Sequence, residues 1–471
     1  MTSPGSPTAV APVDRSRPAR RPLDELSLPV DIAALEAACL GSPSWLVDDR
    51  RAGFESWRAL PGESNLLYTP YIDLRPARLD DARVVSETDP DRGLAADHPG
   101  RGLPDDADGL IEITDGRLSS LVLSPAAANA GVSLVSLAEQ LERDPDRARA
   151  WFSAGPGLPE RDKFAQLSRA LWAQGVVLDV PPGVRVERPI VIRWAAGEPG
   201  RALLTRTLVQ LGAGAEASIV EELVASPGAA DAAEQSFFAG TTEVRLEAGA
   251  RLRVASLQEL AAQTIAFQHR RAEIGEGASL KWALAQLGGR LVRSRVDNRL
   301  VGDRSSVEQV EIVFGAEEQS FDLTSYTTHI GRDTTGDLLS KGALMDRART
   351  YLKGLITIEK SAIGTDSFLG EFGMNLSKAA RSVAIPSLEI DQPDCRRAAH
   401  ASSVGPIDES QLFYLESRGI PPDEARKFIV LGFLEPVVAR VPLASARDRL
   451  REALEAKWTA GSLAATRAAA A

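Results

Sequence analysis

Histidine and cysteine are the residues of this chain best suited to metal or sulfur chemistry, and the chain has four histidines and two cysteines in 471 residues. His400 is the strongest candidate, because its neighbours Ala398, Ala399, Ala401 and Ser402 are small and let another surface or a cluster approach the imidazole. Imidazole binds iron or zinc and exchanges protons near neutral pH. A single histidine in a loop is more often structural than a ligand, so both interpretations stay open.

Three other residues are weaker candidates. His329 lies in the polar segment SYTTHIGRDTTGD, where it either lines a site or has a structural role. Cys395 is followed by two arginines, a setting that suits a redox-active or iron-contacting thiol, although a structural thiol is the simpler interpretation. Cys39 falls among the apolar residues of a predicted helix at 31–40, which predicts a small buried side chain.

The motifs and composition restrict the classes of function. The chain contains no G-x-x-x-x-G-K-[ST] sequence, so we expect no P-loop nucleotide site of its own, and no C-x-x-C or H-E-x-x-H pair. A net charge of -11 argues against a general nucleic-acid-binding surface. The chain contains no run of eighteen apolar residues, so we expect no membrane span. Two distant cysteines and the lack of a hydrophobic signal core favour the cytoplasm.

Residues 175–405 have the texture of a β region. Short β-branched runs alternate with glycine turns, and the corners fall at Gly183, Gly214, Gly249, Gly277 and Gly302, at intervals of 31, 35, 28 and 25 residues. Such spacing without intervening helices predicts a β-solenoid or a large sandwich. In a solenoid, each coil buries its inward side chains only against its neighbours.

The residues before this region predict a mostly helical N-terminal domain at 23–174, preceded by a disordered tail at 1–22. The elements expected in this domain are helices at 31–40, 132–141 and 163–174, an exposed loop at 80–108, and a hairpin at 110–123 that turns at Asp115-Gly116.

The residues after the β region predict a C-terminal helical domain at 406–460. Asp408 is a good N-cap with Gln411 three residues on, and Gly419 stops the first helix. A second helix begins at 421–422, and a third carries Leu450, Leu454 and Trp458 at four-residue steps. Residues 461–471 are alanine-rich and are expected to fray.

The stretch 385–420, IPSLEIDQPDCRRAAHASSVGPIDESQLFYLESRGI, resembles the SufB/SufD core proteins of the SUF iron-sulfur cluster assembly system. The matching segments are SLEI at 387–390, HASSVG at 400–405, ID at 407–408, QLFYL at 411–415 and SRGI at 417–420. Within the family, the chain is more similar to the SufD branch: SufB proteins usually carry a cysteine near 374–386 and a glutamate after the junction histidine, where this chain has Ala401.

The resemblance implies a right-handed parallel β-helix between two helical domains, and a scaffold rather than an enzyme. It implies pairing with a SufB-like subunit through the β-helix ends, and a transient iron-sulfur cluster at that interface with His400 as a metal ligand or proton-handling residue. It also implies that a SufC-like ABC ATPase binds the C-terminal helices. The residues expected at that contact are Asp408, Leu412, Phe413, Tyr414, Arg418, Phe428 and Phe433.

Other interpretations stay open at this point. A flavin in the complex and a homodimer are both compatible with the resemblance. A β-helix carbohydrate-active enzyme would show an exposed groove with clustered carboxylates. A purely structural solenoid would bind protein without any cluster chemistry.

Overall fold

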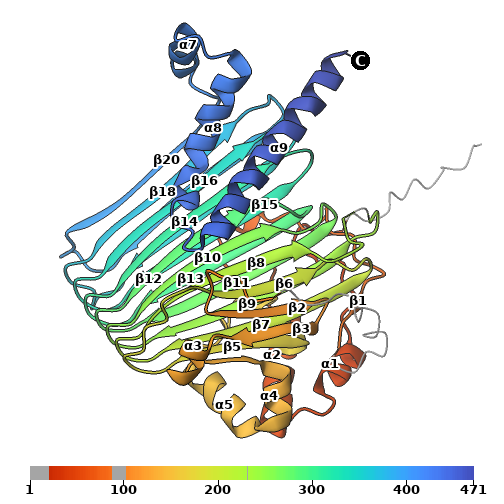
Figure 1. Ribbon diagram of the computed structural model, residues 1–471, viewed down its shortest axis with the longest axis vertical. Coiled ribbons are helices and arrows are strands. Elements are labelled where there is room, and N and C mark those ends of the chain that lie inside the picture. The colour runs from red at the N-terminus through yellow and green to blue at the C-terminus, as the bar shows by residue number, and fades with distance from the viewer. Residues whose placement is uncertain (1–20, 87–101, 231, 471) are drawn as a thin grey trace, which may run out of the picture.

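The computed structural model describes residues 21–86, 102–230 and 232–470, with side chains up to 461. Residues 1–20 of the predicted tail at 1–22 and residues 87–101 of the predicted loop at 80–108 therefore lie outside the described residues. Two ten-stranded sheets stack on one another and form a parallel β-solenoid of about eight turns, with helices at both ends of the chain (Figure 1). The fold predicted from the glycine spacing and the resemblance is confirmed as a parallel β-solenoid.

From β5 onward, successive strands alternate between the two sheets, so that each sheet pairs strands that lie one full turn apart in the sequence. The first sheet contains β19 (Arg381–Ile390), β17 (Arg349–Ile358), β15 (Ser320–His329), β13 (Leu291–Leu300), β11 (Thr264–Ile274), β9 (Ser236–Leu246), β7 (Arg201–Leu211), β5 (Gln174–Val180) and β4 (Ser133–Ser136), and β1 (Arg83–Val84) pairs with β7. The second sheet contains β20 (Arg397–Gly405), β18 (Asp366–Asn375), β16 (Thr335–Leu344), β14 (Ser306–Gly315), β12 (Ser279–Gln286), β10 (Arg251–Glu259), β8 (Glu216–Ala225), β6 (Ile190–Ala196), β2 (Gly109–Thr114) and β3 (Arg117–Leu123).

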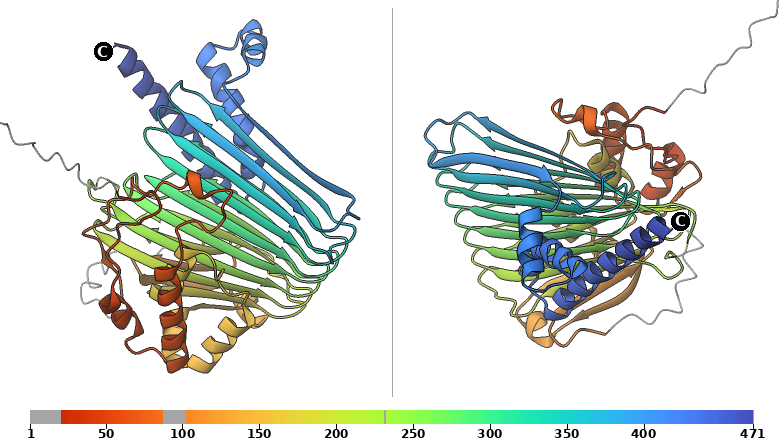
Figure 2. Two further views of the ribbon diagram at one scale, coloured as in Figure 1. Left: turned by 180° about the vertical axis from the view of Figure 1, so that it is seen from behind. Right: turned by 90° about the horizontal axis from the view of Figure 1, so that it is seen from above.

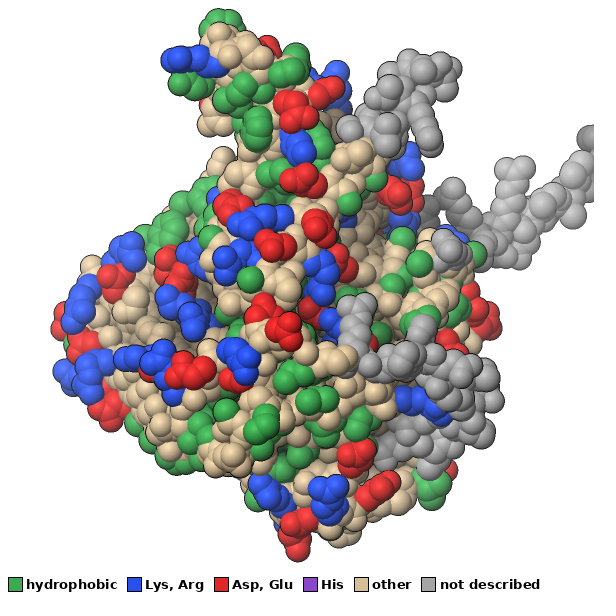
Figure 3. Space-filling model, in the orientation of Figure 1, with side chains coloured by type: hydrophobic (Ala, Val, Ile, Leu, Met, Phe, Trp, Pro, Cys, Tyr) green, Lys and Arg blue, Asp and Glu red, His purple; other side chains and the backbone are tan. Residues whose placement is uncertain are grey.

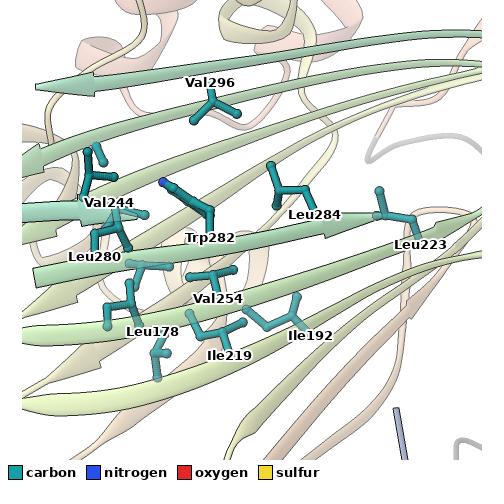
Figure 4. Packing of buried hydrophobic residues seen from close by; sticks show 14 of the residues in the cluster. Leu178, Ile192, Ile219, Leu223, Val244, Val254, Leu280, Trp282, Leu284 and Val296 are labelled. Atoms are coloured by element: carbon teal, nitrogen blue, oxygen red, sulfur yellow. The ribbon is translucent and has the colours of Figure 1, made fainter. Parts of the chain in front are cut away.

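The interior between the two sheets is the main hydrophobic core. Residues in register on neighbouring strands repeat the same inward position at every turn, as Ile219, Val254 and Trp282 do on β8, β10 and β12. Figure 4 shows these side chains pointing into the space between the sheets. Because side chains alternate between the two faces of a strand, every second residue enters this core. The alternation seen in the sequence is therefore the inward and outward pattern of the solenoid.

The corners that precede the strands of the second sheet stack on one another. Gly183, Gly214, Gly249 and Gly277 have φ between 61° and 71°, the left-handed region that glycine enters without a steric penalty. The predicted fifth corner is confirmed, because Gly302 lies in the turn between β13 and β14, but the left-handed residue of that turn is Arg304, with φ 57°. Glycine is nevertheless required at 302, because an added Cβ would collide with the backbone of Glu276 in the previous turn.

The N-terminal end of the solenoid is closed by antiparallel strands. The predicted hairpin is confirmed: β2 and β3 pair, and Asp115 and Gly116 both have positive φ at the turn. The predicted helix at 132–141 is wrong in its first half, where Leu134 and Val135 belong to β4 and pair antiparallel with β5. Pairing with β5 overrides the helical spacing of that segment.

Helices from the first part of the chain pack against the outer face of the first sheet, as Figure 2 shows from behind. They are α1 (Ile32–Cys39), α2 (Ser44–Ala59), the 3-10 helix η1 (Thr69–Tyr71), α4 (Leu137–Arg143), α5 (Pro145–Ala154) and α6 (Lys163–Leu171), whereas α3 (Pro125–Asn129) adds Ala127 to the interior core. Asp31 caps α1 and Asp162 caps α6, which confirms the helices predicted at both places. The outward side chains Phe237 and Phe267 of the sheet contact this layer.

The C-terminal helices are α7 (Glu409–Ser417), α8 (Pro422–Val438) and α9 (Ala444–Ala470). Helices α8 and α9 pack against the outer face of the second sheet, where Val430, Leu434, Leu450 and Leu454 are buried. Helix α9 runs on to Ala470 where the sequence predicted a frayed end, because alanine is the strongest helix former. Among the described residues, no helix is long and apolar enough to cross a membrane.

Candidate functional site

The two ends of the solenoid differ in how their strands are covered. At the C-terminal end, β19 and β20 are the last strands of their sheets, and each pairs on one side only, with β17 and β18. Apolar side chains are accordingly exposed there, Ile390 by 45% and Val404 by 41%. An edge strand offers free N–H and C=O groups to an incoming strand. We call β19, β20 and the turn between them the open end.

His400 lies on the interior face of the open end. It pairs in register with Leu369 of β18, and Leu369 belongs to the interior core. Paired residues in parallel strands point to the same face, so the imidazole is directed toward the solenoid interior. It is nevertheless exposed, since no further turn covers it. The small residues beside it, Ala399 and Ala401, point to the opposite face.

Cys395 lies at the corner of the last turn. At the stacked corners that precede β16, β18 and β20, the N–H of Asp333 donates to the Ile363 carbonyl and the N–H of Gly364 donates to the Asp394 carbonyl, both at 2.8 Å. Cys395, the next residue, takes the same place and is half-buried against the interior core. The strand positions from Arg397 to His400 alone cover about 10 Å. The structure therefore does not bring the thiol and the imidazole together.

His329 is buried inside the solenoid, two strands before the end of the first sheet. Its Nδ1 lies 2.8 Å from Thr334 Oγ1 and its Nε2 lies 3.0 Å from Ser367 Oγ. Burial lowers the pKa of this imidazole to about 4. Both ring nitrogens are thus occupied by hydroxyl groups within the chain, and the geometry is that of a satisfied structural residue.

Sequence reasoning missed Glu371, an inward-facing carboxylate next to the open end. It pairs in register with Ser402 of β20, and its Oε2 accepts a hydrogen bond from the N–H of Ile385 at 2.8 Å. Burial raises the pKa of this carboxyl to about 7, despite the opposing effects of that hydrogen bond and of Lys353. In the sequence, Glu371 falls two residues after Leu369, which alternation places on the same inward face of β18. This placement of a carboxylate on an inward face is the one signal that the sequence offered.

Helix α7 has no buried residue and projects beyond the last turn (Figure 1). Phe413 is 73% exposed and Tyr414 58%, and Phe428 at the start of α8 is 56% exposed. Figure 3 shows hydrophobic side chains gathered on this projection. Large exposed apolar side chains that lie together mark interaction surfaces. We call this group, with Leu412 and Arg418, the α7 surface.

Two residues of the expected ATPase contact have internal roles. Asp408 caps α7, its Oδ1 accepting from the Ser410 N–H at 2.8 Å. Phe433 is half-buried and lies under the Lys341 ammonium, 4.6 Å from the ring centroid. The structure therefore brings Phe413, Tyr414 and Arg418 together on one helix and directs Phe433 toward the solenoid.

No group of three or more His, Cys, Asp and Glu in the described part of the chain is arranged to hold a metal ion. His400 supplies a single nitrogen at an exposed edge.

Residues 193–433 match the family model described as SUF system FeS cluster assembly, SufBD core domain. The match covers just over half of the chain, from β6 into α8, and includes the open end with His400. The chain therefore belongs to the SufBD core family of the SUF iron-sulfur cluster assembly system, as the sequence resemblance predicted.

Within this family the chain is SufD-like. The iron-sulfur cluster assembly protein SufD of Bacillus subtilis (strain 168) is 28% identical over 338 residues, which are 72% of this chain and 76% of that protein. An iron-sulfur cluster assembly SufBD family protein of Mycobacterium tuberculosis (strain ATCC 25618 / H37Rv) is 32% identical over 225 residues, 46% of this chain and 57% of the relative. A Mycobacterium leprae (strain TN) family member is 27% identical over 310 residues, 64% of this chain and 76% of the relative.

Proposed function

We propose that this chain is a non-enzymatic scaffold subunit of a cytoplasmic SUF complex that pairs with a SufB-like subunit and binds a SufC-like ATPase. The observation that carries the proposal is the open end: a solenoid that closes its first turns with antiparallel strands and leaves β19 and β20 uncovered, with His400 on the inner face. Family membership supplies the iron-sulfur context.

The open end suits pairing with another solenoid. The N–H of Arg397 donates to the carbonyl of Thr365, the residue before β18, so alternation along the strand directs the N–H of Val404, seven residues on, to the free edge. A strand from a partner adds to such an edge by main-chain hydrogen bonds. The exposed Ile390 and Val404 add apolar area that a partner buries.

The nascent cluster is the cargo of this interface. His400 offers one imidazole nitrogen, and a thiolate of the SufB-like partner would complete the coordination together with further ligands. A mixed set of one imidazole and soft thiolates from two chains holds iron and sulfide less rigidly than four thiolates of one chain. That lability suits a cluster that must leave its scaffold.

The α7 surface is the contact proposed for the ATPase. It is apolar and exposed, and Arg418 lies over the Tyr414 ring at 5.3 Å from its centroid, which adds a cation at the rim. Aromatic and arginine side chains are enriched at the energetic centre of protein interfaces. Because α8 packs on the second sheet, a force applied at α7 reaches the solenoid near the open end.

The test is co-purification of the full-length chain, co-expressed with a SufB-like and a SufC-like subunit. The proposal predicts that all three chains elute together and that the mixture assembles an iron-sulfur cluster. A chain that retains neither partner, or that elutes only as a homodimer when both are present, would contradict it. A carbohydrate-active solenoid would instead bind oligosaccharides, which isothermal titration detects directly.

A further inference from the structure

A cleft of about 780 Å³ lies between the N-terminal helices and the outer face of the first sheet. Its walls come from α2, α5, α6, the connection at 155–161, and the strands β7, β11 and β13. Its volume is in the range typical of small-molecule sites. The cleft involves neither the open end nor the α7 surface, so its role is independent of the function proposed above.

The charge of the cleft is opposite to that of the chain. The whole sequence has 65 acidic and 54 basic residues. The side chains that line the cleft include only two acids, Asp49 and Glu160, and no lysine. They include six arginines: Arg149, Arg161, Arg169, Arg206, Arg271 and Arg299. Glu243 and Glu273, which pair with Arg206 and Arg299, reduce the excess of four positive charges among the lining residues to two, and this excess within one concave site concentrates a positive potential there.

Half of these arginines are held in place by carboxylates. The pairs are Arg169 with Asp49 at 2.6 Å, Arg206 with Glu243 at 2.6 Å, and Arg299 with Glu273 at 3.2 Å. Within the described ranges, Arg149, Arg161 and Arg271 have no ion-pair partner. The paired arginines therefore form a fixed wall, and the other three supply uncompensated charge.

Several donors along this wall are buried without an acceptor. Among the described residues, Arg271 Nε and Trp45 Nε1 have no hydrogen-bond partner, and Arg206 Nη1 lies 3.8 Å from Asp49 Oδ2 without a hydrogen bond. Burial lowers the pKa of Arg271, and the charge of Arg299 lowers it further. Arginine stays charged in proteins. The lowered pKa of Arg271 therefore means that the surrounding carboxylates compensate its charge poorly. An anion in the cleft would satisfy both the donors and the charge.

We propose that this cleft binds a small ligand that carries a diphosphate group, with Arg271, Arg161 and Arg149 contacting its oxygens. A guanidinium presents its N–H groups as a planar fork that matches two phosphate oxygens at once, which an ammonium does not. Three uncompensated guanidinium groups balance a diphosphate better than a single phosphate. The exclusive use of arginine along the walls follows from this geometry.

The test is isothermal titration calorimetry of the full-length chain with sodium pyrophosphate at low ionic strength. We expect saturable binding of one pyrophosphate per chain, weaker binding of inorganic phosphate, and loss of affinity as salt is added. Arg271→Gln should weaken binding by roughly tenfold or more, since it removes a charge-assisted contact. The double variant Arg149→Gln/Arg161→Gln, at two exposed positions where no folding defect is expected, should weaken it similarly.

Arg332→Gln is the matched control, because Arg332 is an exposed arginine on a corner outside the cleft and should leave affinity unchanged. Thermal unfolding of each variant checks that it folds. Absence of saturable pyrophosphate binding by the wild-type chain would overturn the proposal. Equal affinity of wild type and the double variant would also overturn it, whatever the behaviour of Arg271→Gln.

Discussion

His400 on β20 lies directly beside Leu369 on β18, at the end of an inward-facing column that runs the length of the second sheet. The column passes through Ile219, Val254, Trp282, Gln309 and Leu338 before it reaches Leu369. Most of its members are apolar and buried. An imidazole therefore takes the place of a core residue at the last turn, where the interior opens to solvent.

Val404→Pro should disrupt pairing with a SufB-like subunit. Proline removes the N–H that alternation places on the free edge of β20, and edge strands tolerate proline without loss of an internal bond. We expect the affinity for the partner to fall by roughly tenfold, with the thermal unfolding temperature nearly unchanged. Surface plasmon resonance measures the affinity. Val404→Thr, which keeps the N–H, is the control and should bind nearly as wild type.

Phe413→Asp should weaken binding of a SufC-like ATPase. The aspartate places a charge where a 73%-exposed aromatic ring would be buried by the partner, and truncating such anchors costs about 2 kcal/mol or more. Pull-down with the purified ATPase measures the loss. Leu66→Asp is a matched control, because Leu66 is 88% exposed on the N-terminal layer. Equal loss in both variants would show that the α7 surface is not the contact.

Glu371→Gln should change the pH dependence of stability. The folded-state pKa of about 7 lies above the ordinary 4.5, so the native state binds the proton more tightly than the unfolded state. Stability from this group is therefore full below pH 4.5 and is lost as pH rises to 7. The glutamine variant should be more stable than wild type at pH 8 by up to about 3 kcal/mol. Urea unfolding at several pH values measures the difference.

The wild-type profile contains an opposite contribution from His329, whose folded-state pKa of about 4 lies below the ordinary 6.5. That group destabilises the fold as pH falls from 6.5 to 4, because the unfolded state then binds more protons. The Glu371→Gln variant should consequently lose stability on acidification more steeply than wild type. Parallel stability profiles for the two proteins would mean that Glu371 ionises normally.

Gly302→Ala should destabilise the solenoid more than Gly277→Ala. At Gly277, φ is 61° and an added Cβ meets nothing within 4 Å, so the cost is about 1–2 kcal/mol of backbone strain. At Gly302 the Cβ would collide with the backbone of Glu276, so the turns must separate. Chemical denaturation of the two variants gives the comparison. A smaller loss for Gly302→Ala would show that the corner can shift freely.

The sequence predicted the solenoid well because its signals are local. Alternating apolar residues and the glycines at 183, 214, 249 and 277 record each turn within a few residues. The segment at 132–141 was misjudged because its helical spacing is overridden by pairing with β5, a partner some forty residues away. Gly302 lies in the predicted corner, but it is needed there for close approach and not for positive φ, two needs that look the same in the sequence.

The candidate sites were predicted unevenly for a similar reason. His400 stands out by residue type and by the small residues around it. Glu371 gains its properties from burial and from Ile385 and Lys353 on other strands, and the arginine cleft joins α5, β11 and β13, which only folding brings together. Properties that depend on register or on distant strands are not visible in a linear pattern.

The most direct test of the account is iron-sulfur cluster assembly by the complex that contains His400→Ala, with Ser402→Ala as the control on the same face of β20. The account predicts that both variants co-purify with the SufB-like and SufC-like subunits, and that only His400→Ala fails to accumulate the visible absorption of a cluster. Normal cluster formation by an intact complex carrying His400→Ala would contradict the role assigned to this residue.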